Sequence, residues 1–584
     1  TSLIRIFKRK HIRVALLTPG FGDVTANSNL KAVDYNNKGL RRLAKSVLRL
    51  AKKAYESYTL LLPDHHYHAW ASQHEGRCFV EQDLTKQPLI SVVVPLYNTP
   101  ADHLLHMVYS IVNQHYENWE LILVNGSEKP ECRHQAQDCK NIDTRIKIVD
   151  LQKNEGISGN TNAGIAAANG EFIAFFDHDD LLHPCALHCV VEALQQNPEP
   201  DLLYTDEDKI TDSGDLYLEP HCKPGWSPDL LCNVNYINHL TVMRTEHVKQ
   251  AGGLRPAHNG AQDYDLLLRV IDMCKPRICH IPRVLYHWRA AATSTAQDIT
   301  NKTYIFKAGS EAILEHLKRT GAKATVAPIT GKPGFYKVRY QKTKYSILVG
   351  SVSVEKQYLC AQWIEALTKH VDKEAELIVG SWYKAYRERY PSNIPVKYVK
   401  ESENYWKEAA HLATHSVVIC FKAALLPNAE NALAELAAVA ADPGHGVVAP
   451  LIVGKDRVIV DAGIVDANGL PKQLFFGKKA ESSTYFGSTE WVRNTSDVMT
   501  YALAMKTNLL ESLSLKHAYA RARTFKQAAG ETSSQHITMW AHSVFVYKGM
   551  LDSAAEDSDY NAQLTQLTPS LTMHADNWED GYER

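Results

Sequence analysis

The sequence predicts an α/β protein in which a helical N-terminal segment is followed by two sheet-containing domains. From Pro88, short β-branched runs alternate with stretches of helical periodicity, which is typical of a doubly wound, mostly parallel sheet. After about residue 335 the alternation starts again, at a period near 250 residues, as expected of a duplicated domain. We therefore expect a basic helical segment at 1–86, a first domain at 87–335 and a second domain with an acidic tail at 336–584.

Composition and charge exclude several classes of protein. Of the 584 residues, 45% are apolar and 22% charged, which argues against a disordered or fibrous chain. Lys and Arg number 64 and Asp and Glu 65, and this balance excludes a protein that grips nucleic acid along its surface. No run of about 18 apolar residues and no secretory signal is visible, and the 11 cysteines include no C-x-x-C pair. We expect a cytoplasmic protein with reduced thiols.

The N-terminal segment contains an amphipathic helix near residues 40–58. Leu40, Leu43 and Val47 recur at helical spacing, and the opposite face carries Arg41, Lys45 and other cations. Such a helix either packs on its own protein with a solvated basic face or contacts anionic lipid head groups. The second alternative predicts peripheral contact with the inner face of the cell membrane. The nearby histidines 65, 66 and 68 are interpreted as part of a polar connector.

The first domain begins with four predicted strands. They cover residues 89–95, 119–124, 145–150 and 171–176, with helices expected at 104–114 and 158–169. In sheets of this kind, ligands bind outside the carboxyl ends of the strands. Polar residues at those ends are therefore the candidates for a functional site.

Three carboxylates, Asp177, Asp179 and Asp180, follow the fourth predicted strand. Such crowding of like charge is unfavourable unless a cation neutralises it, and Mg²⁺ or Mn²⁺ prefers carboxylate and phosphate oxygens. The alternative is a solvated acidic turn that caps the next helix.

Two later residues extend this hypothesis. Asp263 lies where a loop enters a helix, so it is either a first-turn acid or a general base that faces a cleft. His287 lies near a strand end, where a histidine is usually just packed, but it could complete a carboxylate–histidine metal shell. The acidic run Asp206, Glu207 and Asp208 ends another strand. Trp226 is either a platform for a sugar ring or an anchor to the core.

Taken together, these segments resemble the family 2 inverting glycosyltransferases of the GT-A fold, and most closely the tandem-domain bacterial enzymes of O-antigen and surface-polysaccharide assembly. The resemblance covers about residues 88–296. It rests on seven segments in the family's order, at 91–98, 119–124, 154–158, 176–180, 204–209, 262–266 and 280–288.

The resemblance implies a role for each matching residue. The family's D-x-D motif falls on Asp177 and Asp179, which would hold Mn²⁺ or Mg²⁺ on the donor's diphosphate, with His287 completing the shell, and Asp263 matches the catalytic base. Binding of the nucleotide sugar is implied for Pro95, Tyr97, Asn98, Asn125, Asn154, Asp177 and His178. Binding of the acceptor is implied for Asp180, Asp206, Glu207, Asp208 and Trp226. Asn125 departs from the aspartate that the family often has there, which leaves the base preference open between a UDP- and a dTDP-linked donor.

The second domain resembles the same family over about residues 340–510, but its chemistry looks lost. The position of the acidic triplet reads Cys420-Phe421-Lys422-Ala423-Ala424, and no Asp-bearing base loop is evident around residues 527–540. We expect a non-catalytic domain that serves as scaffold, acceptor-binding surface or dimer contact. A divergent second active site is the alternative.

The sequence therefore predicts a metal-dependent glycosyltransferase that moves a sugar from a nucleotide donor to a growing, lipid-linked bacterial surface glycan. Two other classes stay open at this point. One is a catalytically inactive carbohydrate-binding protein, and the other is a metal–nucleotide enzyme such as a nucleotidyltransferase.

Overall fold

The computed structural model describes part of the chain, and all of the described residues lie in one compact unit, 64–584. They are residues 65–74, 84–196, 199–290, 303–402, 404–454, 456–467, 470–480, 491–495, 498–499, 501–512 and 536–550. The expected basic helix at 40–58 and the acidic tail lie outside them. None of the described helices is both long and apolar enough to cross a membrane. The domain limits expected at residues 86 and 335 remain predictions.

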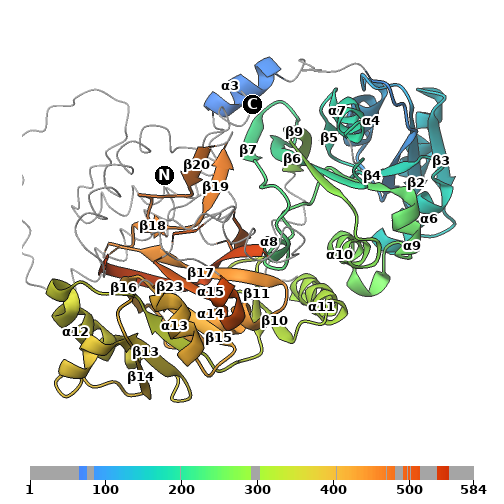
Figure 1. Ribbon diagram of the computed structural model, residues 1–584. Coiled ribbons are helices and arrows are strands. Elements are labelled where there is room, and N and C mark those ends of the chain that lie inside the picture. The colour runs from blue at the N-terminus through green and yellow to red at the C-terminus, as the bar shows by residue number, and fades with distance from the viewer. Residues whose placement is uncertain are drawn as a thin grey trace, which may run out of the picture. The chain divides into compact units, whose positions relative to one another are not determined.

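The first large sheet has the order β3-β2-β1-β4-β8-β6-β9-β5, with β7 beside β6 (Figure 1). Its strands are β1 (Ile90–Leu96), β2 (Trp119–Asn125), β3 (Ile146–Asp150), β4 (Phe172–Phe175), β5 (Leu181–Leu182), β6 (Leu202–Thr211), β7 (Tyr217–His221), β8 (Thr241–Arg244) and β9 (Ile278–Ala290). Every residue of β1 and β2 is buried, as expected of central strands that are covered on both faces.

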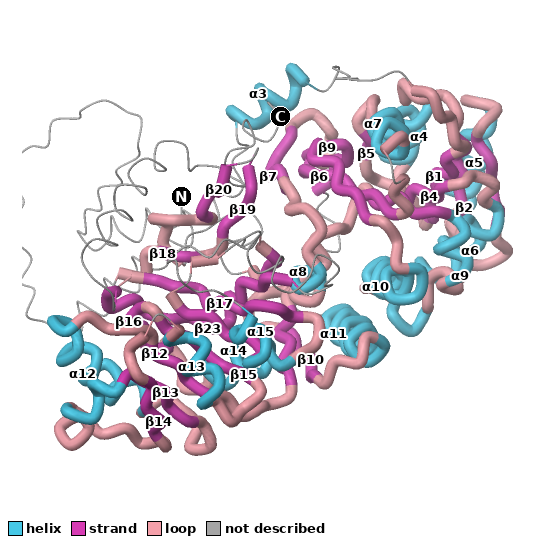
Figure 2. Tube along the Cα trace, in the orientation of Figure 1, coloured by secondary structure: helices cyan, strands magenta, loops and turns pink. Residues whose placement is uncertain are grey.

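Helices alternate with these strands along the chain (Figure 2). They are α4 (Ala101–Val112), α5 (Pro130–Asp138), α6 (Gly156–Ala167), α7 (Ala186–Leu194), α8 (Pro228–Leu231), α9 (Thr245–Gln250), α10 (Gln262–Cys274) and α11 (Thr303–Arg319). Small residues let α6 lie close to the sheet, because a Cβ on Gly164 would come within 2.5 Å of the Val93 side chain. The strands and helices expected between residues 89 and 176 are confirmed to within about three residues.

A second large sheet repeats the order, as β14-β13-β12-β15-β22-β17-β23-β16. Its strands are β12 (Ser346–Val349), β13 (Glu376–Gly380), β14 (Val396–Val399), β15 (Val417–Phe421), β16 (Ala423–Pro427), β17 (His445–Val453), β22 (Ala502–Lys506) and β23 (His536–Met550), with β18 (Ile459–Asp461) and β21 (Arg493–Asn494) beside it. Its helices are α12 (Gln357–Thr368), α13 (Tyr405–Leu412), α14 (Ala432–Ala441) and α15 (Thr507–Ser512). Two hairpins complete the described strands, β10 (Ala324–Pro328) with β11 (Tyr336–Tyr340) and β19 (Ile464–Ala467) with β20 (Leu470–Gln473).

The two sheets agree in strand direction as well as in order. In the first sheet β1 runs parallel to β2 and β4, and β8 runs antiparallel to β4 and β6. In the second, β12 runs parallel to β13 and β15, and β22 runs antiparallel to β15 and β17. The internal repeat that the sequence predicts is therefore confirmed as a repeat of topology.

The same buried polar cluster also occurs in both sheets. In the first, Glu120 accepts hydrogen bonds from Ser91 Oγ at 2.5 Å and from the Asn169 N–H at 2.7 Å, and it pairs with Lys147. Burial alone would raise the pKa of Glu120, but these contacts outweigh it and lower the pKa to about 2.

In the second sheet, Glu376 occupies the equivalent position opposite Ser346. It accepts a hydrogen bond from Ser346 Oγ at 2.7 Å and pairs with Lys397 Nζ at 2.8 Å. Its pKa is likewise lowered to about 2, because these contacts outweigh the effect of burial. The cluster ties three neighbouring strands together at one end of each sheet.

The two sheets differ at the connection from β4 to β5 and its counterpart from β15 to β16. In the first, the five residues 176–180 separate β4 from β5. In the second, the single residue Lys422 separates β15 from β16. The second sheet therefore lacks the acidic loop as a segment of chain and not only its carboxylates.

Helix α8 joins the two halves through a buried polar contact. Asp229 accepts hydrogen bonds from Asn494 Nδ2 at 2.7 Å and Thr538 Oγ1 at 2.6 Å, and its other oxygen lies 3.0 Å from His445 Nε2. Burial alone would lower the pKa of His445, but Asp229 and Asp442 outweigh it and raise the pKa to about 10. The second half of the chain thus holds the segment that leads from α8 toward the site described below.

The Glu120 cluster predicts an acid-dependent loss of stability. Because the pKa of Glu120 is depressed, its contribution is complete above the unfolded value of about 4.5 and disappears as the pH falls toward 2. We expect Glu120→Gln to cost on the order of 3 kcal/mol at pH 7 and less at pH 3, measured by chemical unfolding at each pH. The exposed residue Glu117, on the same loop as Asn118, provides the matched control Glu117→Gln. A cost for Glu120→Gln that is equal at both pH values would contradict the assignment.

Candidate functional site

A pocket opens beside the carboxyl ends of β1 and β4, where the sequence predicts the site. Its polar lining includes Asp177, Asn235, His239 and Asp263, and Pro95 of β1 lies in its wall. Asp177, one of the two expected metal-binding carboxylates, and Asp263, the expected base, thus line one pocket, although they lie 86 positions apart in the chain.

Asp263 lies in the first turn of α10, where the helix start favours a carboxylate. Asn235 Nδ2 donates a hydrogen bond to Asp263 Oδ2 at 3.1 Å. Burial raises the pKa of Asp263, and the nearby charge of His239 and the Tyr264 N–H partly oppose that rise. A carboxylate with a raised pKa that lines a pocket is chemically suited to accept a proton.

His239 is a pocket residue that sequence reasoning missed. Its Nε2 lies 3.5 Å from Asp177 Oδ2, and its ring stacks on Tyr286 at 4.7 Å between centroids. Its Nδ1 is buried and has no hydrogen-bond partner among the described residues. His239 comes from an irregular segment between α8 and β8, so no hydrophobic period marks it in the sequence.

Strand β9 holds the acidic loop, residues 176–180, through hydrogen bonds. Tyr286 Oη donates a hydrogen bond to Asp180, and the Arg289 N–H donates another to Asp180 at 2.7 Å. Arg289 Nε also donates to the Asp179 carbonyl at 2.6 Å. Burial raises the pKa of Asp180 well above its usual range, and the charges of Asp177 and Asp179 add to that rise. Asp180 is therefore a buried anchor of the loop in this structure, and the acceptor role expected of it stays a prediction.

The structure does not bring His287 to Asp177 and Asp179 as a metal shell. His287 Nδ1 lies 2.6 Å from Asp208 Oδ1, and its ring packs 5.1 Å from that of Tyr217. Of these two neighbouring residues on β9, it is Tyr286 whose side chain reaches the acidic loop, through its hydrogen bond to Asp180. His239 takes the place beside Asp177 that was expected of His287.

The acidic run on β6 is likewise turned inward. Glu207 accepts hydrogen bonds from Lys223 Nζ at 3.1 Å and from the His239 N–H at 3.2 Å. Burial alone would raise the pKa of Glu207, but Lys223 and His221 outweigh it and lower the pKa to about 2. Because Lys223 Nζ also donates to the carbonyls of Ile237 and His239, this ion pair holds the backbone that carries His239.

The neighbours of Glu207 are also used within the protein. Asp206 accepts from the Lys223 N–H and contacts His280 Nε2, each at 2.8 Å, and Asp208 accepts from Tyr67 Oη at 2.5 Å. All three carboxylates are buried, and the acceptor role expected of Asp206, Glu207 and Asp208 stays a prediction. Trp226 is partly buried against the main core, as its alternative reading as an anchor requires.

Three of the residues expected to bind the nucleotide, Tyr97, Asn98 and Asn125, lie at the carboxyl ends of β1 and β2. With Pro95 they form what we call the braced wall, because hydrogen bonds join the two loops. Asn98 Oδ1 accepts the N–H groups of Glu128 and Lys129, each at 3.0 Å, so the two loops are joined. Tyr97 is 44% exposed beside them. Asn125 is fully buried, and its Nδ2 donates to Asp150 Oδ1 at 2.9 Å. Asn125 thus holds the end of β2 to the end of β3. Asp150, at the end of β3, is half-exposed and supplies a carboxylate at this edge of the sheet.

Two further residues of that set lie nearby. Asn154 Oδ1 accepts the Gly156 N–H and Asn160 Nδ2, each at 3.0 Å, which fixes the start of α6. His178 is partly exposed within the acidic loop, with Nδ1 3.9 Å from Asp179 Oδ1. The structure leaves the nucleotide roles of both as predictions.

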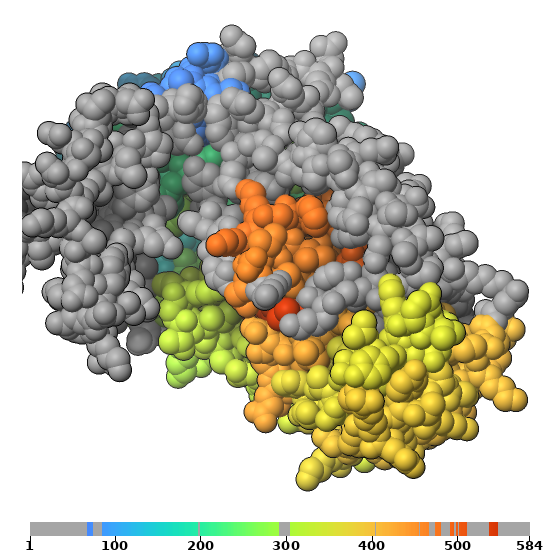
Figure 3. Space-filling model, turned by 90° about the vertical axis from the view of Figure 1, so that its left-hand side faces the viewer, coloured from blue at the N-terminus to red at the C-terminus, as the bar shows by residue number. Residues whose placement is uncertain are grey.

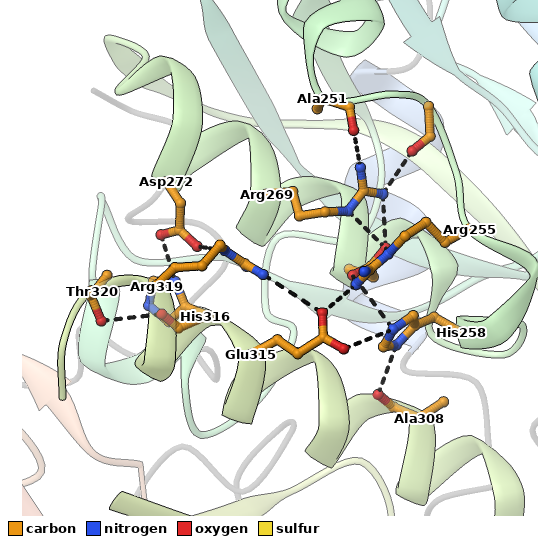
Figure 4. Close-up of polar contacts among 12 residues, drawn as sticks. Ala251, Arg255, His258, Arg269, Asp272, Ala308, Glu315, His316, Arg319 and Thr320 are labelled. Atoms are coloured by element: carbon orange, nitrogen blue, oxygen red, sulfur yellow. Dashed lines mark hydrogen bonds and ion pairs between the residues drawn. The ribbon is translucent and has the colours of Figure 1, made fainter. Parts of the chain in front are cut away.

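One other group of potential metal ligands occurs in the described part of the chain. Potential ligand atoms of His258, Asp265 and Glu315 lie within 4.8 Å of one another, and no other three His, Cys, Asp or Glu residues of the described part do so. Arginines already occupy this group, since Arg255 pairs with both carboxylates and Arg269 pairs with Asp265 (Figure 4). We therefore interpret it as an ion-pair network that fixes α10 against α11.

Comparison with known proteins shows that part of the chain matches a protein family. Residues 91–218 match the model described as Glycosyl transferase family 2. The O-antigen biosynthesis protein RfbC of Myxococcus xanthus is 30% identical over 471 residues, which cover 76% of this chain and 36% of that protein. Protein y4gI of Sinorhizobium fredii is 41% identical over 261 residues, covering 44% of this chain and 29% of that protein. The chain thus spans about a third of the length of these relatives.

Solved structures are similar only at a low level. The structure of S. aureus TarS 1–349 in complex with UDP-GlcNAc has a TM-score of 0.32 and 15% identity, and covers 39% of this chain and 72% of that one. That score is too low to support any statement about this chain. The family match spans β1 to the start of β7, including the acidic loop after β4. The chain therefore contains a family 2 glycosyltransferase domain.

Proposed function

We propose that this chain is a metal-dependent inverting glycosyltransferase that moves a sugar from a nucleotide donor to a growing glycan. The observation that carries the proposal is that Asp177 and Asp263 line one pocket at the ligand-binding edge of the sheet. An inverting transfer needs one group that accepts the acceptor's proton and a separate group that binds the departing diphosphate. The pocket offers a carboxylate for each task.

Asp263 is the proposed general base. The acceptor hydroxyl attacks the anomeric carbon of the donor sugar, the bond from that carbon to the diphosphate oxygen breaks, and the hydroxyl proton passes to Asp263. The raised pKa of Asp263 makes its carboxylate a better proton acceptor than an ordinary aspartate, provided that it stays ionised at working pH. Asn235 would orient it through their hydrogen bond.

Asp177 and Asp179 are the proposed ligands of Mn²⁺ or Mg²⁺. They fit the role because both are partly exposed carboxylates two residues apart in the sequence, with His239 3.5 Å from Asp177 and His178 3.9 Å from Asp179. When bound, the cation would offset the charge of the leaving nucleoside diphosphate. His239 would hold Asp177 in place and supply a polar group on the donor side of the pocket.

The donor and acceptor are proposed from the family and the relatives' names. The braced wall at Pro95, Tyr97, Asn98 and Asn125 would contact the base of a UDP- or dTDP-linked sugar. The name of the relative RfbC refers to O-antigen biosynthesis, and we propose a growing bacterial surface glycan, lipid-linked at the inner face of the cell membrane, as the acceptor. The second half of the chain is proposed to be non-catalytic, since only Lys422 connects β15 to β16.

Replacing the two pocket aspartates separately tests the assignment of roles. We expect Asp263→Asn to lower kcat by about 10²–10⁴-fold while Mn²⁺-dependent donor binding is kept, because only the proton acceptor is lost. Asp177→Asn should instead weaken donor binding in the presence of Mn²⁺. Release of nucleoside diphosphate and isothermal titration with the donor measure the two effects.

The same pair of variants separates the rival classes. A carbohydrate-binding protein would bind glycan equally well with either substitution and would release no nucleoside diphosphate. A nucleotidyltransferase would release pyrophosphate or a nucleoside monophosphate. Either result would overturn the proposal.

The raised pKa of Asp263 also predicts a pH dependence. The base must be ionised, so kcat/KM should fall as the pH drops through the raised pKa of Asp263, above its usual value of 3.8. His239 partly lowers that pKa, and we therefore expect His239→Gln to move the acid limb of the profile to higher pH. His411→Gln, at an exposed histidine on α13, should leave the limb in place. A limb that does not move in His239→Gln would show that another group controls it.

A further inference from the structure

A second pocket lies on the other half of the chain, between the β10–β11 hairpin, α14 and β23. It has a volume of about 600 Å³, which is within the usual range for pockets that bind small ligands. Ala434 and Ala438 face it from α14, one turn apart, and their small side chains leave the space open. Segment 303–342, which carries the hairpin, is yellow-green in Figure 3 and reaches the surface there.

The rim of this pocket is basic. Lys323, Arg339 and Lys342 line it, all three are exposed, and none has an ion pair within the described part of the chain. The one carboxylate in the lining, Glu435, is already paired with Lys337 Nζ, which lies 2.9 Å from both of its oxygens. The pocket thus presents uncompensated positive charge.

The inner wall is aromatic and polar. Tyr340 and Trp540 lie edge to face, with ring centroids 6.0 Å apart, and both line the pocket. Trp540 is 4% exposed, and its indole N–H has no hydrogen-bond partner among the described residues. Thr325, Gln341 and Asn431 add groups that can donate and accept hydrogen bonds.

This combination points to a particular chemistry. Flat apolar ring faces cover the C–H faces of sugars, hydroxyl and amide side chains bind sugar hydroxyls, and exposed cations bind carboxylate or phosphate groups. A neutral sugar would leave the three cations unused, whereas a free phosphate would leave the aromatic wall unused.

We propose that this pocket binds an anionic segment of carbohydrate, whose carboxylate or phosphate groups contact Lys323, Arg339 and Lys342. If the chain is the transferase proposed above, that segment belongs to the acceptor glycan, and in this respect the inference rests on the proposed function. The second half would then hold the glycan while the first half extends it. Tyr340 also packs on His445, which pairs with Asp229 of α8, so the pocket wall adjoins the contact between the halves.

Binding of defined oligosaccharides without any donor tests the inference. Tetragalacturonic acid and the neutral maltotetraose are titrated into the full chain by calorimetry at low salt. We expect the acidic oligomer to bind at least about tenfold more tightly than the neutral one, and its affinity to fall as salt is raised. The double variant Arg339→Ala/Lys342→Ala should lower that affinity by about tenfold or more.

Lys344→Ala is the matched control, because Lys344 is equally exposed near the same strand end but pairs with Glu374. It should bind as the unmodified chain does. Equal binding of both oligomers, or an affinity that the double variant leaves unchanged, would overturn the inference. Full displacement of the acidic oligomer by equimolar inorganic phosphate would also overturn it, in favour of a simple phosphate site.

The outcome can be separated from that of the proposed function. Asp263→Asn should bind tetragalacturonic acid as well as the unmodified chain, since Asp263 is not in this pocket. In the unmodified chain, binding of tetragalacturonic acid without any release of nucleoside diphosphate would keep the pocket and refute the transferase. Release of nucleoside diphosphate without binding of tetragalacturonic acid would keep the transferase and refute the pocket.

Discussion

The crowding of three carboxylates within residues 177–180 is the constraint on which the rest of the site depends. Like charges at this spacing repel one another. Tyr286 and Arg289 of strand β9 offset that repulsion by donating hydrogen bonds to Asp180 and to the Asp179 carbonyl. Asp180 is anchored in the interior as a result, whereas the side chains of Asp177 and Asp179 are partly exposed, with His239 3.5 Å from Asp177 and His178 3.9 Å from Asp179. We propose that an acidic loop held in this way receives a cation.

The second half of the chain shows what the fold becomes when this constraint is absent. It keeps the strand order, the strand directions and even the buried Ser–Glu–Lys cluster of the first half. It replaces the acidic loop by Lys422, so β16 follows β15 almost directly. The buried cluster is thus a requirement of the sheet, while the acidic loop is an addition that only one of the two sheets carries.

Periodicity and strand ends were enough to predict much of this arrangement from the sequence. They placed the strands, the repeat and the carboxylates at 177 and 179, because these features depend on local spacing. They failed where burial depends on residues far apart in the chain. Asp206, Glu207 and Asp208 look like an exposed acidic run, but donors from distant segments form hydrogen bonds with each of them in the interior. His287 was expected beside Asp177, and His239 was missed, because the sequence does not say which histidine the fold brings next to that residue.

The number of nucleotide sites per chain tests the account most directly. Equilibrium binding of a nucleoside diphosphate, UDP or dTDP, in the presence of Mn²⁺ gives that number. The account predicts one site per chain, which belongs to the first sheet. Two equivalent sites would contradict the loss of chemistry in the second half, and the absence of any site would contradict the role given to the acidic loop.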